Sequence, residues 1–257
     1  MFDDSIYEIK GGMVYLPGGT FVMGAREEET AEIVRNLKAN GDIWADVILS
    51  EQPRHDVFLS PFYIDMYEVT QGEFLRVMGY NPSRHKGGPC LPVDSATKPE
   101  AMEYCRRVGK RLPTEAEYEY AARGGANTTF FWGEDEESAD EYAWYAKNSG
   151  LAPHPVGTKK PNAFGLYDMI GNMWEWCSDN FSLDYYKPDY YTKHHHINPH
   201  GPSFNGGEFA ERSAIRGGSY MSFCDGLRCA NRGRHMPDNP WELHNATFRC
   251  VYSVAFK

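Results

Sequence analysis

Two cysteines near the end of the sequence, Cys224 and Cys229, are separated by four residues. Thiolates are soft ligands that select Cu(I), so a close pair of cysteines suits a copper or redox centre. The same pair could instead form a disulfide or provide two small buried hydrophobic side chains, since free cysteine is commonly buried. Both interpretations of this pair stay open from the residues alone.

A second group of ligand-type side chains lies in the segment GLYDMIGNMWEW, where Asp168, Asn172 and Glu175 follow one another at short spacing. Calcium favours oxygen ligands of this kind in flexible loops. The alternative is a hydrogen-bonded turn that needs no ion. The segment therefore predicts either a calcium site or a polar turn.

A run of three histidines, His194 to His196, is followed by His200. Neutral imidazole is a common metal ligand, but adjacent histidines cannot all face one ion. We expect a solvent-exposed loop rather than a metal site. The sequence holds no G-x-S-x-G, H-E-x-x-H, Walker or Rossmann motif.

The net charge of −10 comes without any stripe of Lys and Arg, which argues against a nucleic acid or an anionic membrane as partner. No stretch approaches the roughly 18 consecutive apolar residues of a membrane span. The first residues show no basic and apolar export signal, so we expect a cytoplasmic protein.

Helices and strands are predicted mainly in the first half of the chain. Thr70 with Glu73 and Thr114 with Glu117 fit capping boxes, and the helices that they begin should end at Gly79 and Gly124. Two further helices are expected over 26–41 and 99–109, the second with Met102, Cys105 and Val108 on its inner side. Strands are expected within 13–23 and 55–70. After residue 125 the pattern gives way to short aromatic runs and turns, and no linker divides residues 1–257, so we expect one domain.

Three blocks of the sequence carry a resemblance to a known family: GKRLPTEAEYEYAARGG (109–125), PNAFGLYDMIGNMWEWCSD (161–179) and AIRGGSY with LRCANR and FRC (214–250). Their order and spacing resemble those of the formylglycine-generating enzymes, and weaker matches extend over nearly the whole chain. The resemblance implies an α+β, loop-rich, complex C-type-lectin-like fold. It implies no single activity, because the family holds copper-dependent oxidases, sulfoxide-forming domains and the variable binding proteins of diversity-generating retroelements.

In the oxidases of this family, two copper thiolates lie just after the RGGSY block. The spacing of Cys224 and Cys229 resembles that pair, but the stretch after Cys229 aligns with a region downstream of the copper site. In that register Cys224 matches the second copper cysteine, the first falls in a deletion near Ser222, and Cys229 matches a structural cysteine whose partner position is Ala122. Cys224 and Cys229 are therefore either a copper-binding pair at a shifted position or ordinary cysteines, in a disulfide or as buried thiols.

Other cysteines and site residues follow from the same resemblance. Cys105 and Cys250 match a structural disulfide of some relatives, although two adjacent thiols fit equally well, and Cys90 and Cys177 are expected in the core. Asp168, Asn172 and Glu175 match a calcium-binding segment. Ser219 matches a residue of the oxidase site, and the candidate groove consists of Trp174, Tyr220, Phe223, Arg228 and His235.

Two functions are consistent with these residues. The first is a copper-type oxidoreductase that uses oxygen on a thiol or a peptide cysteine, with Cys224, Cys229 and Ser219 as catalytic candidates. The second is a non-catalytic binding protein whose ligand is a peptide, a thiol small molecule or a protein. Its solvent-facing candidates are Ser222, Phe223, Asp225, Gly233, His235 and His244.

Overall fold

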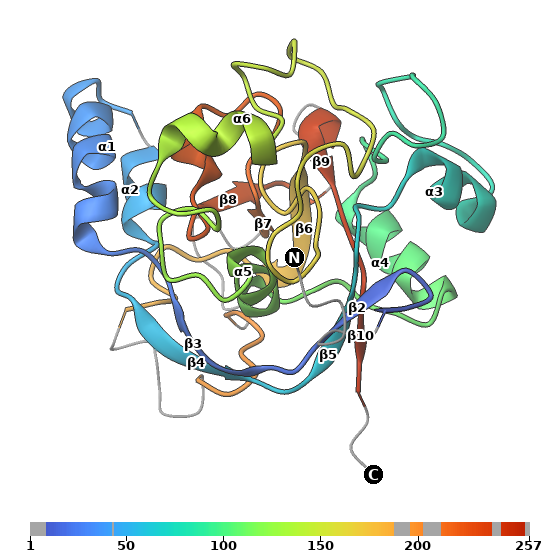
Figure 1. Cartoon of the computed structure of the whole chain (residues 1–257), viewed down its shortest axis with the longest axis horizontal. Coiled ribbons are helices and arrows are strands. Elements are labelled where there is room, and N and C mark those ends of the chain that lie inside the picture. The colour runs from blue at the N-terminus through green and yellow to red at the C-terminus, as the bar shows by residue number, and fades with distance from the viewer. Residues whose placement is uncertain (1–8, 43, 188–195, 203–211, 238–242, 255–257) are drawn as a thin grey trace.

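The computed structural model describes residues 9–42, 44–187, 196–202, 212–237 and 243–254. Within these residues, short strands form three small sheets and the helices lie around them (Figure 1). The strands are β1 (Ile9–Lys10), β2 (Met13–Leu16), β3 (Gly19–Met23), β4 (His55–Leu59), β5 (Phe62–Asp65), β6 (Trp174–Asn180), β7 (Ser213–Arg216), β8 (Arg232–His235), β9 (Ala246–Thr247) and β10 (Val251–Ser253).

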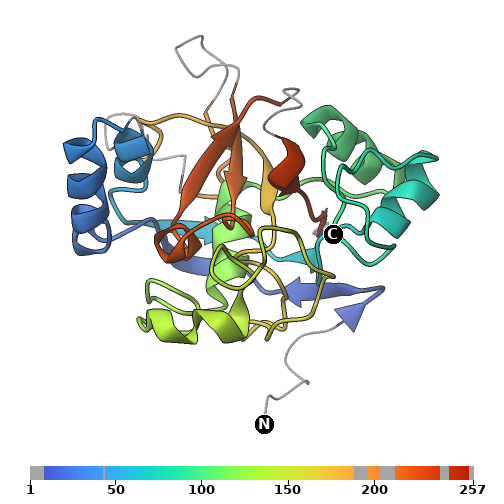
Figure 2. The same cartoon turned by 90° about the horizontal axis from the view of Figure 1, so that it is seen from above.

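The helices are α1 (Glu27–Ala39), α2 (Trp44–Leu49), α3 (Gln71–Met78), α4 (Lys98–Arg107), α5 (Glu115–Arg123) and α6 (Ala139–Tyr142). Three 3-10 turns complete the set: η1 (Glu136–Ser138), η2 (Cys224–Leu227) and η3 (Leu243–Asn245). Seen from above, α1 with α2 and α3 with α4 lie on opposite sides of the molecule (Figure 2). Within the described residues, no helix is long and apolar enough to cross a membrane.

The predicted helices over 70–79, 99–109, 114–124 and 26–41 are confirmed, with boundaries within a few residues. Thr70 and Thr114 each close a capping box with the glutamate three residues later. The predicted inner side of α4 was partly wrong. Met102 is 53% exposed, and the buried side is formed by Ala101, Tyr104 and Cys105.

The predicted strands form, but β2 does not pair with β3, and β4 does not pair with β5. Strand β2 pairs with β5, and β3 pairs with β4, so each sheet joins segments on either side of α1 and α2. Strand β10 adds to the other edge of β5, so the first and last strands of the described chain belong to the same sheet, at its opposite edges. The third sheet has the order β8-β7-β6-β9 and carries the segments of the candidate site.

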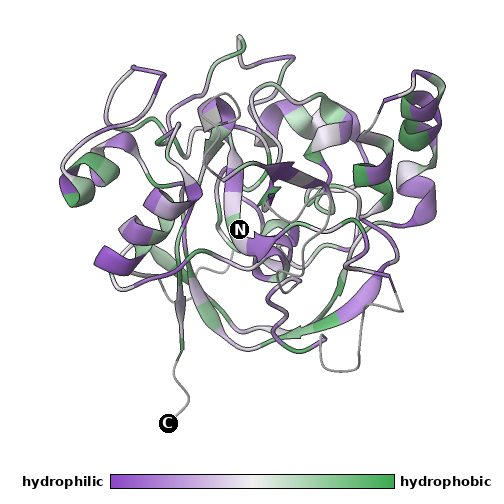
Figure 3. Ribbon diagram, turned by 180° about the vertical axis from the view of Figure 1, so that it is seen from behind, coloured by the Kyte–Doolittle hydropathy of each residue, from purple (hydrophilic) through white to green (hydrophobic). Residues whose placement is uncertain are grey.

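Helix α5 lies between the first two sheets and the third, and every one of its residues is buried (Figure 1). Coloured by hydropathy, the outer helices show both hydrophilic and hydrophobic turns (Figure 3), as expected of helices with one buried face. In α5, by contrast, charged side chains enter the interior. Glu119 bonds Arg123 and Arg216, while Glu115 accepts two hydrogen bonds from Arg232 at 2.8 and 2.9 Å.

These buried ion pairs fix the position of the turn that follows β7. Arg216, the last residue of β7, is fully buried and also donates to the carbonyl oxygen of Cys229 at 3.0 Å. Gly217 has a φ of +95°, and a Cβ there would lie 2.5 Å from the Tyr118 hydroxyl oxygen. The RGG sequence is thus required for the chain to turn this close to α5.

Candidate ligand site at the turn after β7

The turn 217–223 is held by hydrogen bonds of its own and by two neighbouring loops. Ser219 is 1% exposed, and its hydroxyl oxygen accepts from the amide of Met221 at 3.2 Å. The amide of Ser219 donates to the hydroxyl oxygen of Ser222 at 3.0 Å. The predicted catalytic serine therefore has a structural role in the turn, and it is not presented to solvent.

Loop 145–154 packs directly against this turn. The Ser149 hydroxyl donates to the carbonyl oxygen of Tyr220 at 2.8 Å and accepts from the amide of Leu151 at 3.0 Å. The amide of Ala146 donates to the carbonyl oxygen of Ser222 at 2.9 Å. The surface of these two interlocked loops carries three exposed apolar side chains: Leu151 (63%), Met221 (46%) and Phe223 (76%).

The two candidate copper ligands lie in different surroundings, and neither forms a disulfide. Cys229 is 2% exposed within the main hydrophobic core, and its amide donates to the carbonyl oxygen of Thr129 at 2.9 Å. Burial raises the pKa of this thiol to about 12. Cys224 opens η2 and is partly buried, and burial, with the charges of Glu136 and Asp225, raises its pKa to about 11.

Both thiols are protonated at neutral pH, and Cys229 is enclosed in the core. A Cu(I) ion held by the two sulfurs would have to displace both protons. Cys229 and Ala122 belong to the same core cluster, so Cys229 packs as a small hydrophobic residue in the absence of its partner cysteine.

The other groove candidates separate into exposed and buried groups. Phe223 is exposed, and Tyr220 is 2% exposed. Arg228 is also buried and bonds Glu51 through both terminal nitrogens, so its charge is already neutralised within the fold. Trp174 is half-buried against the second core cluster, and His235 has Asn245 Oδ1 at 3.2 Å from Nε2.

Among the residues predicted to face solvent, the prediction was wrong for Gly233. It is buried in β8, where a Cβ would lie 2.8 Å from Ile215 and 2.9 Å from Trp174. His194 and His195 lie outside the described residues. His196 is described, and its Nδ1 lies 2.9 Å from the carbonyl oxygen of Asp56.

The remaining cysteines differ in their exposure to solvent. Cys177 is fully buried, as predicted, whereas Cys90 is exposed, contrary to prediction, because it lies in the open loop 86–90. Cys105 and Cys250 are free thiols whose sulfurs lie 3.3 Å apart in the core. The alternative of two adjacent thiols therefore describes this structure.

The predicted calcium residues are all buried, but they do not share one position. Both carboxylate oxygens of Glu175 accept hydrogen bonds from Arg249 at 2.8 to 3.0 Å, and Oε1 also accepts from the hydroxyl of Tyr118. The Asn172 amide nitrogen donates to Glu68 Oε2 at 2.6 Å, and Asp168 Oδ2 accepts from the amide of Gly157 at 2.6 Å. Among the described residues, no group of three or more His, Cys, Asp or Glu side chains is placed to hold a metal ion.

Glu68 is the functional candidate that the sequence did not indicate. It is 1% exposed, and its Oε1 is buried without a hydrogen-bond partner among the described residues. Burial and the charges of Asp168 and Glu175 raise its pKa well above the usual value, while burial raises the pKa of Asp168 to about 6. The charge of Arg249 opposes both shifts, and that of Lys159 opposes the shift of Asp168, but the pKa values of both carboxyl groups remain raised.

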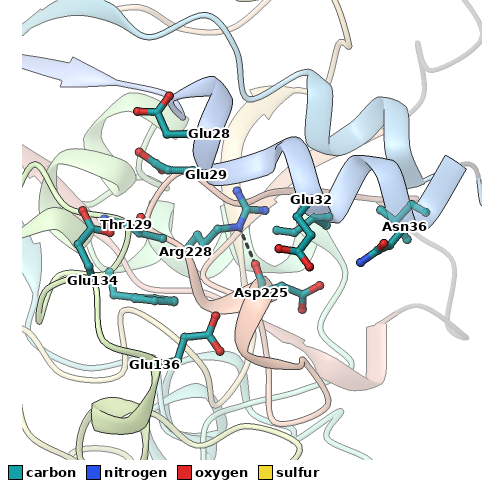
Figure 4. A pocket seen from close by; sticks show the side chains of 12 residues that line it. Glu28, Glu29, Glu32, Asn36, Thr129, Glu134, Glu136, Asp225 and Arg228 are labelled. Atoms are coloured by element: carbon teal, nitrogen blue, oxygen red, sulfur yellow. Dashed lines mark hydrogen bonds between the residues drawn. The ribbon is translucent and has the colours of Figure 1, made fainter. Parts of the chain in front are cut away.

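A pocket of about 510 Å³ opens beside η2, between α1 and the loop 129–136 (Figure 4). Its walls are rich in carboxylates, and Arg228 Nε donates to the carbonyl oxygen of Asp225 at 2.7 Å across its floor. It is lined by Glu28, Glu29, Glu32, Ile33, Asn36, Leu37, Thr129, Phe130, Glu134, Glu136, Asp225 and Arg228. Helix α1 supplies half of this lining, which sequence motifs could not show.

The small mixed sheets, the buried arginine of the RGG turn and the long loops define the class as the complex C-type-lectin-like fold of the formylglycine-generating type. The family model of the sulfatase-modifying factor enzyme 1-like domain matches residues 7–254, so the chain belongs to this family.

Similar proteins include the formylglycine-generating enzyme of Streptomyces coelicolor, 32% identical over 93% of this chain and 88% of the relative. The structure is similar to that of PvdO from Pseudomonas aeruginosa, with a TM-score of 0.71, 29% identity and 93% of each chain covered. It also resembles Treponema denticola variable protein 1, with a TM-score of 0.74, 95% of this chain and 97% of that chain covered. At 24% identity this last likeness concerns the fold alone.

Proposed function

We propose that the chain is a ligand-binding member of its family, and that the binding face is formed by the turn after β7 and loop 145–154. The observation that carries this proposal is the presence of three exposed apolar side chains, Leu151, Met221 and Phe223, on two loops joined by hydrogen bonds. Exposed apolar patches mark interaction sites. The ligand is a peptide, a thiol small molecule or a protein.

A selection of displayed random peptides on the intact protein tests this proposal. Peptides that bind the proposed face should bind the double variant Met221→Ser, Phe223→Ser at least about tenfold more weakly, since about 1.4 kcal/mol of lost apolar burial corresponds to that factor. The matched control is Leu75→Ser, which removes a side chain of 49% exposure on α3. Equal binding to the double variant and to the control would contradict the proposed face.

A second candidate function is oxidation of a thiol with oxygen at a copper centre. It is supported by the retained pair Cys224 and Cys229 and by relatives named formylglycine-generating enzyme. Oxygen uptake by the copper-treated protein with a cysteine-containing peptide tests it. Uptake that requires Cys224, compared with a Cys224→Ser variant, would support this function, and equal uptake by both proteins would exclude it.

We further propose that a calcium ion stabilises the fold between Glu68 and Asp168 in place of the predicted set with Glu175. The Glu68 oxygen without a hydrogen-bond partner and the raised pKa values of both carboxyl groups support this position, since calcium takes carboxylate, carbonyl and water oxygens. Such an ion would neutralise two buried carboxylates and would have no part in chemistry at the turn.

A further inference from the structure

The pocket between α1, η2 and the loop 129–136 is distinguished by its charge. Its volume of about 510 Å³ lies within the range of small-molecule sites, roughly 300–1,000 Å³. Arg228 is the one cation of its lining, and Glu51 already binds both terminal nitrogens of that guanidinium. The other charged side chains of the lining are six carboxylates: Glu28, Glu29, Glu32, Glu134, Glu136 and Asp225. The pocket therefore presents an excess of negative charge.

A single cation, Arg26, is shared by three of these carboxylates. Its guanidinium donates to Glu29 Oε1 and, at 2.7 Å, to Glu134 Oε1, and its Nε lies 3.7 Å from Glu28 Oε1. The side chain of Glu29 is only 5% exposed, yet its Oε2 forms no hydrogen bond with the described residues. Because a buried acceptor without a partner is costly, and Glu29 lines the pocket, a donor bound there would satisfy this oxygen.

The other three carboxylates, Glu32, Glu136 and Asp225, form no ion pair within the part of the chain that the structure describes. They come from three different segments, α1, η1 and η2 (Figure 4). Like charges on the walls of one pocket repel each other, and a bound cation would remove that repulsion. Among the described residues, no three of these side chains are placed to hold one metal ion. Carboxylates spread around a pocket in this way fit an organic cation with more than one charged group.

Apolar side chains form the rest of the wall. Ile33 and Leu37 lie one turn apart on α1 and therefore on the same face of the helix, and Phe130 joins them from the loop 129–136. Methylene groups pack against such a surface while the charged groups that they carry stay with the carboxylates. An ammonium group donates in three directions and suits carboxylates from different segments, whereas a guanidinium suits one carboxylate bound through two parallel hydrogen bonds. The lining therefore matches ammonium groups on an aliphatic chain.

We propose that this pocket binds a free polyamine, an aliphatic chain with two or more ammonium groups. The ammonium groups bind Glu32, Glu136 and Asp225, and the methylene groups contact the apolar wall. Lysine side chains of a polypeptide have the same chemistry, and the experiment below separates the two sources. The inference goes beyond the proposed binding face and does not depend on it, although Asp225 follows Phe223 by only two positions.

Isothermal titration calorimetry of the intact protein with spermidine tests this inference. The double variant Glu32→Gln, Asp225→Asn keeps the shape of both side chains and should bind spermidine at least about tenfold more weakly. The matched control Asp56→Asn, Glu137→Gln removes two negative charges at exposed positions outside the pocket and should bind like the wild type. This control separates the pocket from the general attraction of a cation to a chain of net charge −10.

Two further probes define the ligand. Putrescine and Mg²⁺ carry the same charge, and we expect putrescine to displace spermidine at a concentration at least about tenfold below that of Mg²⁺. The peptide acetyl-Lys-Ala-Lys-amide should bind more weakly than spermidine, and tighter binding of this peptide would replace the free polyamine with a lysine-containing polypeptide.

Three results overturn the inference: no binding of spermidine or the peptide, equal weakening by both double variants, or displacement by Mg²⁺ as effective as that by putrescine. The thermal unfolding midpoint of Glu32→Gln, Asp225→Asn should be no lower than that of the wild type, because these substitutions remove like charges. The variant Met221→Ser, Phe223→Ser should retain its affinity for spermidine, so failure of this site is distinguishable from failure of the binding face.

Discussion

Arg228 is assigned here to the fold and not to a ligand groove, because it pairs with Glu51 inside the protein. The stability of variants of this pair tests the assignment quantitatively. Glu51 has no exposed surface, and Arg228 is 2% exposed. Arg228→Ala would leave the carboxylate of Glu51 buried without its cation. Removing one partner of a buried ion pair costs about 3–5 kcal/mol. For a domain of this size that corresponds to a fall of roughly 6–20 °C in the midpoint of thermal unfolding.

The pH dependence of that variant has a definite sign. Burial raises the pKa of Glu51 above 4.5, and the charge of Arg228 opposes this shift. Without Arg228 the folded-state pKa rises further, so the folded protein holds this proton more tightly than the unfolded chain. The free energy of unfolding then falls as the pH rises from about 4.5 through the folded-state pKa. Acidification from neutral pH should therefore recover part of the lost stability.

Differential scanning fluorimetry over a series of pH values, together with denaturant unfolding, measures both effects. The double variant Glu51→Met, Arg228→Leu should recover most of the loss, because replacing both members with apolar residues removes the uncompensated charge. Arg106→Ala, which breaks an exposed pair with Glu103, is the control and should leave the midpoint unchanged. An Arg228→Ala variant as stable as wild type, or a double variant as unstable as the single one, would refute this reasoning.

Three further predictions concern buried groups of the same fold. Added calcium should raise the midpoint of thermal unfolding of the wild type relative to the protein in chelator, whereas the midpoint of Glu68→Gln should not change with calcium. An equal calcium-dependent shift in both proteins would contradict the proposed site. Burial raises the pKa of Asp179 from 3.8 to about 7, so this group lowers the free energy of unfolding as the pH rises through that range, and Asp179→Asn should flatten the dependence measured by denaturant titration. Mild oxidation should form a disulfide between Cys105 and Cys250, because their sulfurs already lie 3.3 Å apart, and peptide mapping would detect it. Cys105→Ser should abolish this disulfide. Two free thiols in the oxidised wild type would contradict the prediction.

The features predictable from the sequence were those determined by neighbouring residues. The capping boxes at Thr70 and Thr114 are local, because each side chain bonds a backbone amide three residues away. The same pattern at Thr97 and Glu100 forms a third capping box that the prediction omitted, although its signal was present. The family blocks supplied the fold class through resemblance.

The features that escaped prediction depend on residues far apart in the chain. Glu68 meets Asn172 across 104 positions, and Arg228 meets Glu51 across 177. No periodicity or spacing encodes such contacts, because they exist only after the sheets assemble. Cys229 illustrates the consequence for the site. Its spacing from Cys224 suggested a ligand pair, and no local pattern shows that Cys229 would be enclosed in the main hydrophobic core.

The central proposal, a binding face in which Cys224 and Cys229 act as ordinary thiols and not as copper ligands, is tested most directly by competition for Cu(I). Anaerobic protein is titrated into a coloured Cu(I)–chelator complex, and wild type is compared with Cys224→Ser and Cys229→Ser. We predict that all three proteins withdraw the same amount of copper. Withdrawal of one equivalent by the wild type that is lost in both variants would contradict the account and restore the copper oxidase.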